Sequence, residues 1–316
     1  MSRSGALYPA DRLVLREVGL RDGLQLVKNW PTTADKIEWL RAEHAAGVRH
    51  FELGSFLPAS RMPQFADLRE LIAASGMLPG ARSAALALNE RGGGDALATD
   101  VDEIVCVVSA TEEHSQANMR RSRIDALSLV REIVAMRDAA GHKAIVNVGI
   151  SMAFGCSIAG DVSETEVLRL VEACLASGAD AVGLADTVGY AGPRQVGDLS
   201  AKARELAGDV PVIVHLHDTR GLGLANAAAA LDAGIRVLDA SLGGLGGCPF
   251  APGATGNIVF EDLVFLAESM GFDTGIALER LAEPRALLAR AMPDEPLRGQ
   301  LSRAGLPKTR WRRCAA

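Results

Sequence analysis

The sequence predicts one α/β domain folded as a (β/α)8 barrel, with extra helices at its C-terminal end. The chain has 316 residues, which is enough for a single large α/β domain. Only 4% of these residues are aromatic, whereas Ala, Gly, Val and Leu are abundant, and this composition suits helices packed closely on a parallel sheet. Strand-like and helix-like segments alternate eight times in about 260 residues, a number and size that favour a closed barrel over a doubly wound sheet.

The first four strands are expected where short apolar runs stand between turn residues, at 13–18, 50–56, 83–88 and 104–109. Helical periodicity fills the intervals, over 33–46, 66–74, a short stretch near Asp95, and 123–140. Gly47 and Gly141 end the first and last of these helices, because glycine readily adopts the left-handed conformation that closes a helix.

The same alternation continues through the second half of the chain. Strands are expected at 144–153, 181–184, 212–217 and 237–242, and helices at 164–176, 193–206, 222–233 and 258–270. Ser163 is a suitable N-cap for the first of these helices, with Glu166 at the capping-box position. The barrel then spans residues 12–272 or so, and residues 273–316 form a helical appendage rather than a second domain.

The composition argues against several classes of protein. A net charge of −6 favours neither a nucleic-acid partner nor an anionic membrane surface. The five cysteines have no CxxC spacing, and no signal peptide or membrane-spanning run is recognisable, so we expect reduced thiols in a cytoplasmic protein. One local exception is the basic segment 308–313, which is either a solvated terminus or an anion-binding arm.

The motif His215-Leu-His217 predicts a metal site. Side chains alternate along a strand, so the two imidazoles share the face that points into the barrel, near its mouth. Asp22 follows the first strand, which a closed barrel places near the seventh, and Asn257 offers a neutral oxygen. Such a set suits Mg²⁺ or Mn²⁺, without excluding Zn²⁺ or Fe²⁺. The alternative is a pair of histidines that are simply hydrogen-bonded inside the barrel.

Arg21 lies beside Asp22 and is a fixed cation that can stabilise a developing oxyanion. The alternative for Arg21 is a surface salt bridge, and Glu52, near the end of the second strand, could hold its guanidinium in place.

Cys248 lies in a glycine-rich and proline-rich segment, 243–257, that predicts a mobile loop over the site. A thiol there could donate or accept a proton, although a buried structural thiol is the commoner fate of cysteine. Cys156, at the end of the fifth strand, could also face the site. His114 is expected to be a solvated loop histidine, with contact to substrate as the alternative.

Together these segments resemble the 3-hydroxy-3-methylglutaryl-CoA lyase family, within the metal-dependent group that includes isopropylmalate, homocitrate and citramalate synthases. The resemblance covers residues 13–285 or so. It rests on EVGLRDGLQ at 17–25, SF at 55–56 with PQ at 63–64, DTVG at 186–189, HLHDT at 215–219 and GGCPFAPGATGN at 246–257.

The resemblance implies a TIM barrel that cleaves a 3-hydroxyacyl-CoA thioester into acetyl-CoA and a keto acid, which is acetoacetate for the methylglutaryl substrate. It implies a divalent metal, Mg²⁺ or Mn²⁺, ligated by Asp22, His215, His217 and Asn257. Arg21 would stabilise the enolate, and Cys248 would protonate it or close over it. Asp22, His215 or metal-bound water would take the hydroxyl proton. Substrate-binding or supporting roles would fall to Gln25, Glu52, Asp186 and Glu261, and a homodimer is implied as well.

Three segments depart from the family pattern and border the expected pocket: 117–122, 155–160 with Ile158 and Ala159, and Phe260. They predict a related 3-hydroxyacyl-CoA substrate that is bulkier or less polar. Alternatives are lyases for citramalyl-CoA or an isoprenoid-branched hydroxyglutaryl-CoA, a condensing synthase, and a catalytically silent partner subunit.

Overall fold

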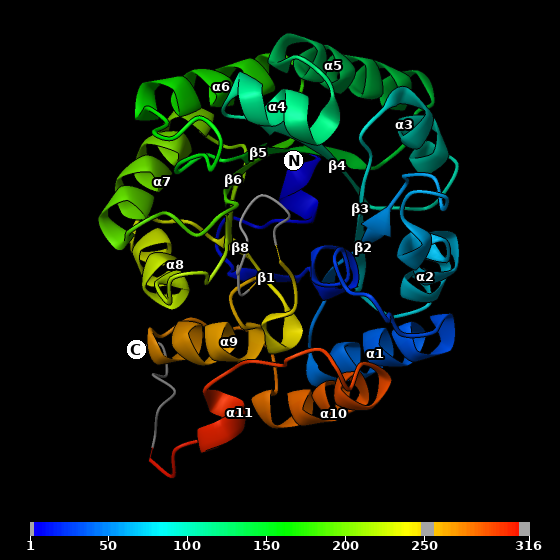
Figure 1. Cartoon of the computed structure of the whole chain (residues 1–316), viewed down its shortest axis with the longest axis vertical. Helices are drawn as coiled ribbons and strands as arrows, with labels where there is room; N and C mark the ends of the chain where they lie inside the picture. The colour runs from blue at the N-terminus through cyan, green and yellow to red at the C-terminus, as the bar shows by residue number, and fades with distance from the viewer. Residues whose placement is uncertain (1–2, 248–255, 310–316) are drawn as a thin grey trace.

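Eight parallel strands close into a barrel in a computed structural model that describes residues 3–247 and 256–309. The strands follow one another around the ring in chain order, and β8 pairs with β1 to complete it (Figure 1). The predicted (β/α)8 barrel is therefore confirmed. The strands are β1 (Val14–Glu17), β2 (His50–Ser55), β3 (Arg82–Leu86), β4 (Glu103–Ser109), β5 (Ile145–Ser151), β6 (Ala181–Asp186), β7 (Val212–Leu216) and β8 (Val237–Ala240).

Helices between consecutive strands form an outer ring around this barrel (Figure 1). They are α1 (Thr33–Ala46), α2 (Leu68–Gly76), α3 (Glu90–Leu97), α5 (Arg123–Ala139), α6 (Glu164–Ala176), α7 (Pro193–Ala207) and α8 (Gly223–Asp232), with α9 (Phe260–Ser269) after β8. Their ends follow local sequence. Gly47 closes α1 at a φ of 111°, and the Ser163 side chain accepts a hydrogen bond from the Glu166 backbone N–H, as predicted.

An additional helix, α4 (Glu112–Met119), precedes α5 and was not predicted. Thr111 caps its first turn, and Arg120 ends it in the left-handed conformation at a φ of 52°. After α9, the chain forms α10 (Ala282–Ala291) and α11 (Leu301–Ala304), and α10 packs against α1. Short helical turns complete the described chain: η1 (Ser4–Ala6), η2 (Gly19–Gly23), η3 (Pro63–Phe65), η4 (Leu242–Gly244) and η5 (Leu278–Leu281).

The barrel interior is apolar at the amino-terminal ends of the strands. A cluster that includes Val14, Ile145 and Val237 fills it there, with Tyr8 from the N-terminal segment. Because side chains on a strand alternate, the residue two positions further along each strand faces inward one layer higher. Four of those residues are polar, namely Arg16, Asn147, His215 and Asp239, and the fifth is Gly183; each stands two positions after a member of the apolar cluster. The fold therefore closes one end of the barrel and leaves polar groups at the other. Among the described helices, none is both long enough and apolar enough to cross a membrane.

Candidate active site

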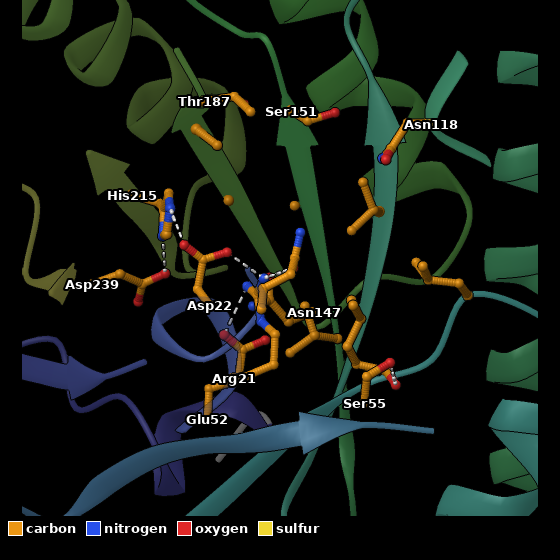
Figure 2. Close-up of a pocket in the computed structure, with 18 of the residues that line it drawn as sticks. Arg21, Asp22, Glu52, Ser55, Asn118, Asn147, Ser151, Thr187, His215 and Asp239 are labelled. Atoms are coloured by element: carbon orange, nitrogen blue, oxygen red, sulfur yellow. Dashed lines mark hydrogen bonds and ion pairs between the residues drawn. The ribbon is translucent and has the colours of Figure 1, made fainter. Parts of the chain in front are cut away.

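Three potential metal ligands meet at the carboxyl-terminal mouth of the barrel. Asp22 lies on η2 directly after β1, His215 lies on β7, and His217 follows it. Asp22 Oδ2 is 3.5 Å from His217 Nε2 and 4.0 Å from His215 Nε2, and the two Nε2 atoms are 3.1 Å apart. Figure 2 shows the Asp22 carboxylate directed toward His215. Ligand atoms of all three residues lie within 4.8 Å of one another, so one ion could contact them together.

Asn257 lies beside this triad, although 235 positions separate it from Asp22 in the sequence. A backbone bridge pairs Asn257 with His217, and its Nδ2 donates to Asp22 Oδ2 at 2.8 Å and to the Leu245 carbonyl at 3.0 Å. Its Oδ1 is buried and has no hydrogen-bond partner among the described residues. A buried amide oxygen without a partner costs free energy unless something accepts its lone pairs, as a cation would.

The protonation of His215 suits metal binding. Its Nδ1 lies 3.1 Å from Asp239 Oδ2, and a carboxylate can only accept, so Nδ1 carries a proton. In the neutral form of this tautomer, which a metal ligand must adopt, the Nε2 lone pair faces Asp22 and His217. Two imidazole nitrogens, one carboxylate and an unpaired amide oxygen therefore fit a divalent metal.

The field around the triad favours an ionised Asp22. Burial opposes ionisation, but the Arg21 guanidinium and the two imidazoles outweigh it and hold the pKa of Asp22 well below its usual range. Burial alone would lower the pKa of His215, but Asp239 and Asp22 raise it above its ordinary value. The carboxylate is thus an anion throughout the neutral pH range, ready to bind a cation.

Arg21 is fixed between two carboxylates. Its Nη1 is 2.5 Å from Asp22 Oδ1, and its Nη2 is 2.8 Å from Glu52 Oε2 (Figure 2). Gln25 Oε1 accepts a longer bond from Nη1 at 3.4 Å. Glu52 is 1% exposed, so its ion pair with Arg21 is shielded from water. The guanidinium is held at the cavity wall rather than in a surface salt bridge.

A cavity of about 280 Å³ contains most of the predicted site. Its lining includes Arg21, Asp22, Gln25, Glu52, His215 and His217. Cys248 lies outside the described residues, as does the basic segment from residue 310 onward.

Asp186 and Glu261 do not line this cavity and instead support loops near it. Asp186 accepts hydrogen bonds from the backbone N–H groups of Tyr190 and Ala191, at 2.8 and 3.1 Å, and so shapes the turn after β6. Glu261 accepts from the backbone N–H of Gly243 at 2.9 Å and pairs with a guanidinium of α10 at 2.7 Å. It therefore anchors the chain just after β8, where the glycine-rich segment begins.

His114 and Cys156 lie in other surroundings than the sequence suggested. His114 was expected to be solvated, but it is 1% exposed on α4 and lines the cavity, because the chain forms a helix there that turns the imidazole inward. Burial lowers its pKa to about 4, so the ring is neutral at pH 7. Cys156 is buried away from the cavity lining, and its Sγ lies 3.3 Å from Thr111 Oγ1.

A buried ion-pair network beneath the triad was missed from the sequence. Asp239 Oδ1 is 3.1 Å from Arg16 Nε, and Arg16 Nη1 is 2.9 Å from Glu103 Oε1. Glu103 also accepts bonds from Tyr8 and from Asn147 Nδ2. The available signals were charged residues within or at the edge of apolar runs: Arg16 in β1, Glu103 at the start of β4 and Asp239 in β8. This network fixes Asp239, and Asp239 in turn orients His215.

A parallel barrel that gathers two imidazoles, a carboxylate and a guanidinium at the carboxyl ends of its strands defines a barrel enzyme with a potential divalent metal site. Comparison with known proteins identifies the family. A family model described as HMGL-like matches residues 12–288. The chain belongs to the HMGL-like family.

Individual relatives cover most of the chain. Hydroxymethylglutaryl-CoA lyase YngG of Bacillus subtilis (strain 168) is 36% identical over 274 residues, which are 87% of this chain and 91% of that protein. A 3-hydroxy-3-isohexenylglutaryl-CoA/hydroxy-methylglutaryl-CoA lyase of Pseudomonas aeruginosa is 38% identical over 275 residues, 85% of this chain and 89% of that one. The structure of an HMG-CoA lyase from A. baumannii, in complex with coenzyme A and 3-methylmalate, superposes with a TM-score of 0.87. That structure is 36% identical and covers 95% of this chain and 97% of its own.

Proposed function

We propose that this protein is a carbon–carbon lyase that cleaves a 3-hydroxyacyl-CoA thioester into acetyl-CoA and a keto acid. One observation carries the proposal: a potential metal triad and an immobilised Arg21 face the same cavity at the mouth of the barrel. The family membership and the names of the relatives support the same reaction. If the substrate is 3-hydroxy-3-methylglutaryl-CoA, the keto acid is acetoacetate.

The reaction breaks one carbon–carbon bond and moves two protons. The hydroxyl on carbon 3 loses its proton to a base, and we assign that role to Asp22 or His215, whose side chains meet in the cavity. The oxygen then forms the ketone as the bond between carbons 2 and 3 breaks. The electrons of that bond pass to the enolate of acetyl-CoA, which is protonated on carbon to complete the products.

Each group has a place in this scheme. A divalent metal held by Asp22, His215, His217 and Asn257 would supply Lewis acidity to the hydroxyl, and we propose Mg²⁺ or Mn²⁺ because the donors mix nitrogen and oxygen. Arg21 stabilises the enolate oxygen, and removing such a donor typically costs about 3–4 kcal/mol in the barrier.

Protonation of the enolate carbon requires an acid, and we assign it to Cys248. Its segment joins Gly247, which lines the cavity, to Gly256, which precedes Asn257. Gln25 and Glu52 position Arg21. Asp186 and Glu261 hold the loops after β6 and β8.

The test is a discontinuous assay with the purified full chain, with Mn²⁺ or Mg²⁺ or with EDTA. Acetyl-CoA should form from 3-hydroxy-3-methylglutaryl-CoA or a related thioester, including citramalyl-CoA, and EDTA should abolish its formation. Consumption of acetyl-CoA with a keto acid, without cleavage, would instead indicate a condensing synthase. No reaction in either direction with any thioester would reject the proposal and favour a silent partner subunit.

Cys248→Ser separates the thiol from the rest of the site. The variant should bind substrate with nearly unchanged affinity, measured by calorimetry, but should turn over at least about a hundredfold more slowly. Normal turnover would remove the thiol from the mechanism and leave the metal and arginine assignments standing.

A further inference from the structure

The cavity has two halves of different chemistry. The charged half comes from β1, β2, β7 and β8 and contains the triad and Arg21. The other half comes from β3 to β6, and in Figure 2 its labelled members Asn118, Ser151 and Thr187 lie apart from Asp22 and Asp239. The proposed lyase chemistry uses only the charged half, so the uncharged half is available for a part of the substrate that does not react.

Aliphatic side chains form one wall of the uncharged half. Leu86 and Val105 are cross-strand partners on β3 and β4, and Leu88 and Val107 pack with them at the cavity. This cluster is separate from the apolar cluster at the amino-terminal ends of the strands and from the main core between sheet and helices. Since it is not needed to seal the barrel, its cavity-facing surface is free to contact an alkyl group.

Two glycines create a recess beside this wall. Val107 on β4 pairs with Gly149 on β5, and Gly149 pairs with Gly183 on β6, so the three lie in one row across the sheet. Gly149 and Gly183 both line the cavity, and neither has a positive φ. Glycine is therefore not required at either position for backbone conformation. At Gly149 the remaining physical reason is the space that glycine leaves, whereas at Gly183 it is the close approach of the Gly149 backbone.

The space at Gly149 is open enough to accept atoms. A Cβ built on Gly149 would have its nearest neighbour, the Cys106 carbonyl oxygen, at 3.8 Å. A Cβ on Gly183 would be tighter, at 3.3 Å from the Gly149 Cα. Gly149 thus provides room for ligand carbons next to Val107.

The polar side chains that line this half among the described residues carry no positive charge at pH 7. Among the described residues that line the cavity, the lysine and arginine side chains are Arg16 and Arg21, both on the β1 side. Ser151 Oγ donates to the Val108 carbonyl at 3.3 Å, and Thr187 Oγ1 accepts from the Met152 N–H at 2.9 Å, so both hydroxyls have backbone partners. A second carboxylate bound in this half would have no cation to pair with, whereas an alkyl chain needs no cation.

We infer that the uncharged half binds the substituent on carbon 3 of the substrate, and that this substituent is an alkyl or alkenyl group larger than methyl. The inference rests on the proposed lyase function and names its substrate class. Val107 and Gly149 are the specificity-determining residues: the valine contacts the chain, and the glycine leaves the volume that the chain occupies.

The test compares three 3-hydroxyglutaryl-CoA thioesters with methyl, butyl or carboxyethyl on carbon 3, each assayed with Mn²⁺. Wild-type kcat/KM should be at least about tenfold higher for butyl than for methyl, because several methylenes are added to an apolar contact. The carboxyethyl compound, equal in length to butyl but charged, should be at least about tenfold poorer than butyl. Equal or better cleavage of the methyl compound would overturn the inference and leave the lyase function intact.

Filling variants give the residue-level test. Gly149→Ala and Val107→Phe should each lower kcat/KM for butyl by about tenfold or more, while the value for methyl stays within about threefold. Gly197→Ala on α7 is the matched control, since its added Cβ also meets nothing closer than 3.7 Å but lies outside the cavity. Circular dichroism shows whether each variant is folded. If Gly149→Ala does not fold, the comparison of butyl with methyl in Val107→Phe tests the inference. An equal loss for methyl and butyl in the filled variants would contradict the assignment. Failure of wild type to cleave any of the three would reject the inference together with the lyase function.

Discussion

Glu17→Gln should make the protein more stable relative to wild type as the pH rises from 5 to 8. Glu17 ends β1 and is buried on the helix side of the sheet, where its Oε1 accepts from the backbone N–H groups of Gly19 at 2.6 Å and Leu242 at 3.2 Å. Its carboxyl group interacts with that of Glu43, which is fully buried on α1. Burial raises the pKa of Glu17 to about 8, although the two backbone donors oppose the shift, and it raises that of Glu43 well above its ordinary value.

The direction and size of the effect follow from proton linkage. Between a pKa near 4.5 in the unfolded chain and one of about 8 in the fold, the folded Glu17 carries a proton that the unfolded one has lost. Stability is therefore lost as the pH rises through this window, at up to ~1.4 kcal/mol per pH unit for one proton. Glutamine keeps the acceptor oxygen and cannot ionise. The free energy of unfolding of the variant should therefore rise relative to that of wild type by up to ~4 kcal/mol between pH 5 and 8.

Urea unfolding at pH 5, 6, 7 and 8 measures this difference directly. Glu38→Gln makes the same chemical change on the exposed face of α1 and should follow the wild-type pH dependence. Parallel curves for Glu17→Gln and wild type would refute the reasoning, because they would mean that the buried carboxyl group binds no extra proton in the fold.

Three further predictions concern the cavity. Asp22→Asn removes the proposed anionic ligand. Mn²⁺ at a hundred times its wild-type Kd should stabilise wild type by about 2.7 kcal/mol and should leave the melting temperature of the variant unchanged. An equal shift of the melting temperature in both proteins would argue against the metal site. Glu52→Gln releases one side of Arg21 and should lower kcat by about tenfold or more while Mn²⁺ affinity stays the same, and unchanged kcat would show that the ion pair does not position the guanidinium. Asp239→Asn can present an amide donor to His215 Nδ1 and so favour the tautomer whose proton is on Nε2. Mn²⁺ titration followed by EPR should then show binding weakened about 10- to 100-fold. Wild-type affinity for Mn²⁺ would contradict the positioning role of Asp239.

Local patterns were sufficient to predict the barrel and the convergence of Asp22, His215 and His217. Alternation along one strand placed His215 and His217 on the same face, and the closure of a parallel barrel brought Asp22 next to them. Both inferences need only chain order and strand geometry. Helix ends at Gly47 and Ser163 were equally local, since capping depends on residues a few positions apart.

Features that depend on pairing between distant strands were not predictable in the same way. Arg16 bridges Asp239 and Glu103 across three strands, and a single arginine in an apolar run does not reveal its partners. Gly149 was indistinguishable from a weak strand position until its neighbours on β4 and β6 were known. His114 was misjudged because the short helix that turns it inward has little apolar periodicity to announce it.

The distance along the chain between Asp22 and Asn257 has a consequence for biosynthesis. The two residues meet only when β8 has paired with β1, and 235 positions separate them. On the proposed ligand set, a ribosome must therefore deliver nearly the whole barrel before the two side chains can share an ion, so loading with metal would follow translation rather than guide it. A nascent or prematurely terminated chain that ends before β8 would lack the complete set of proposed ligands, and bound metal would then report that the ring has closed.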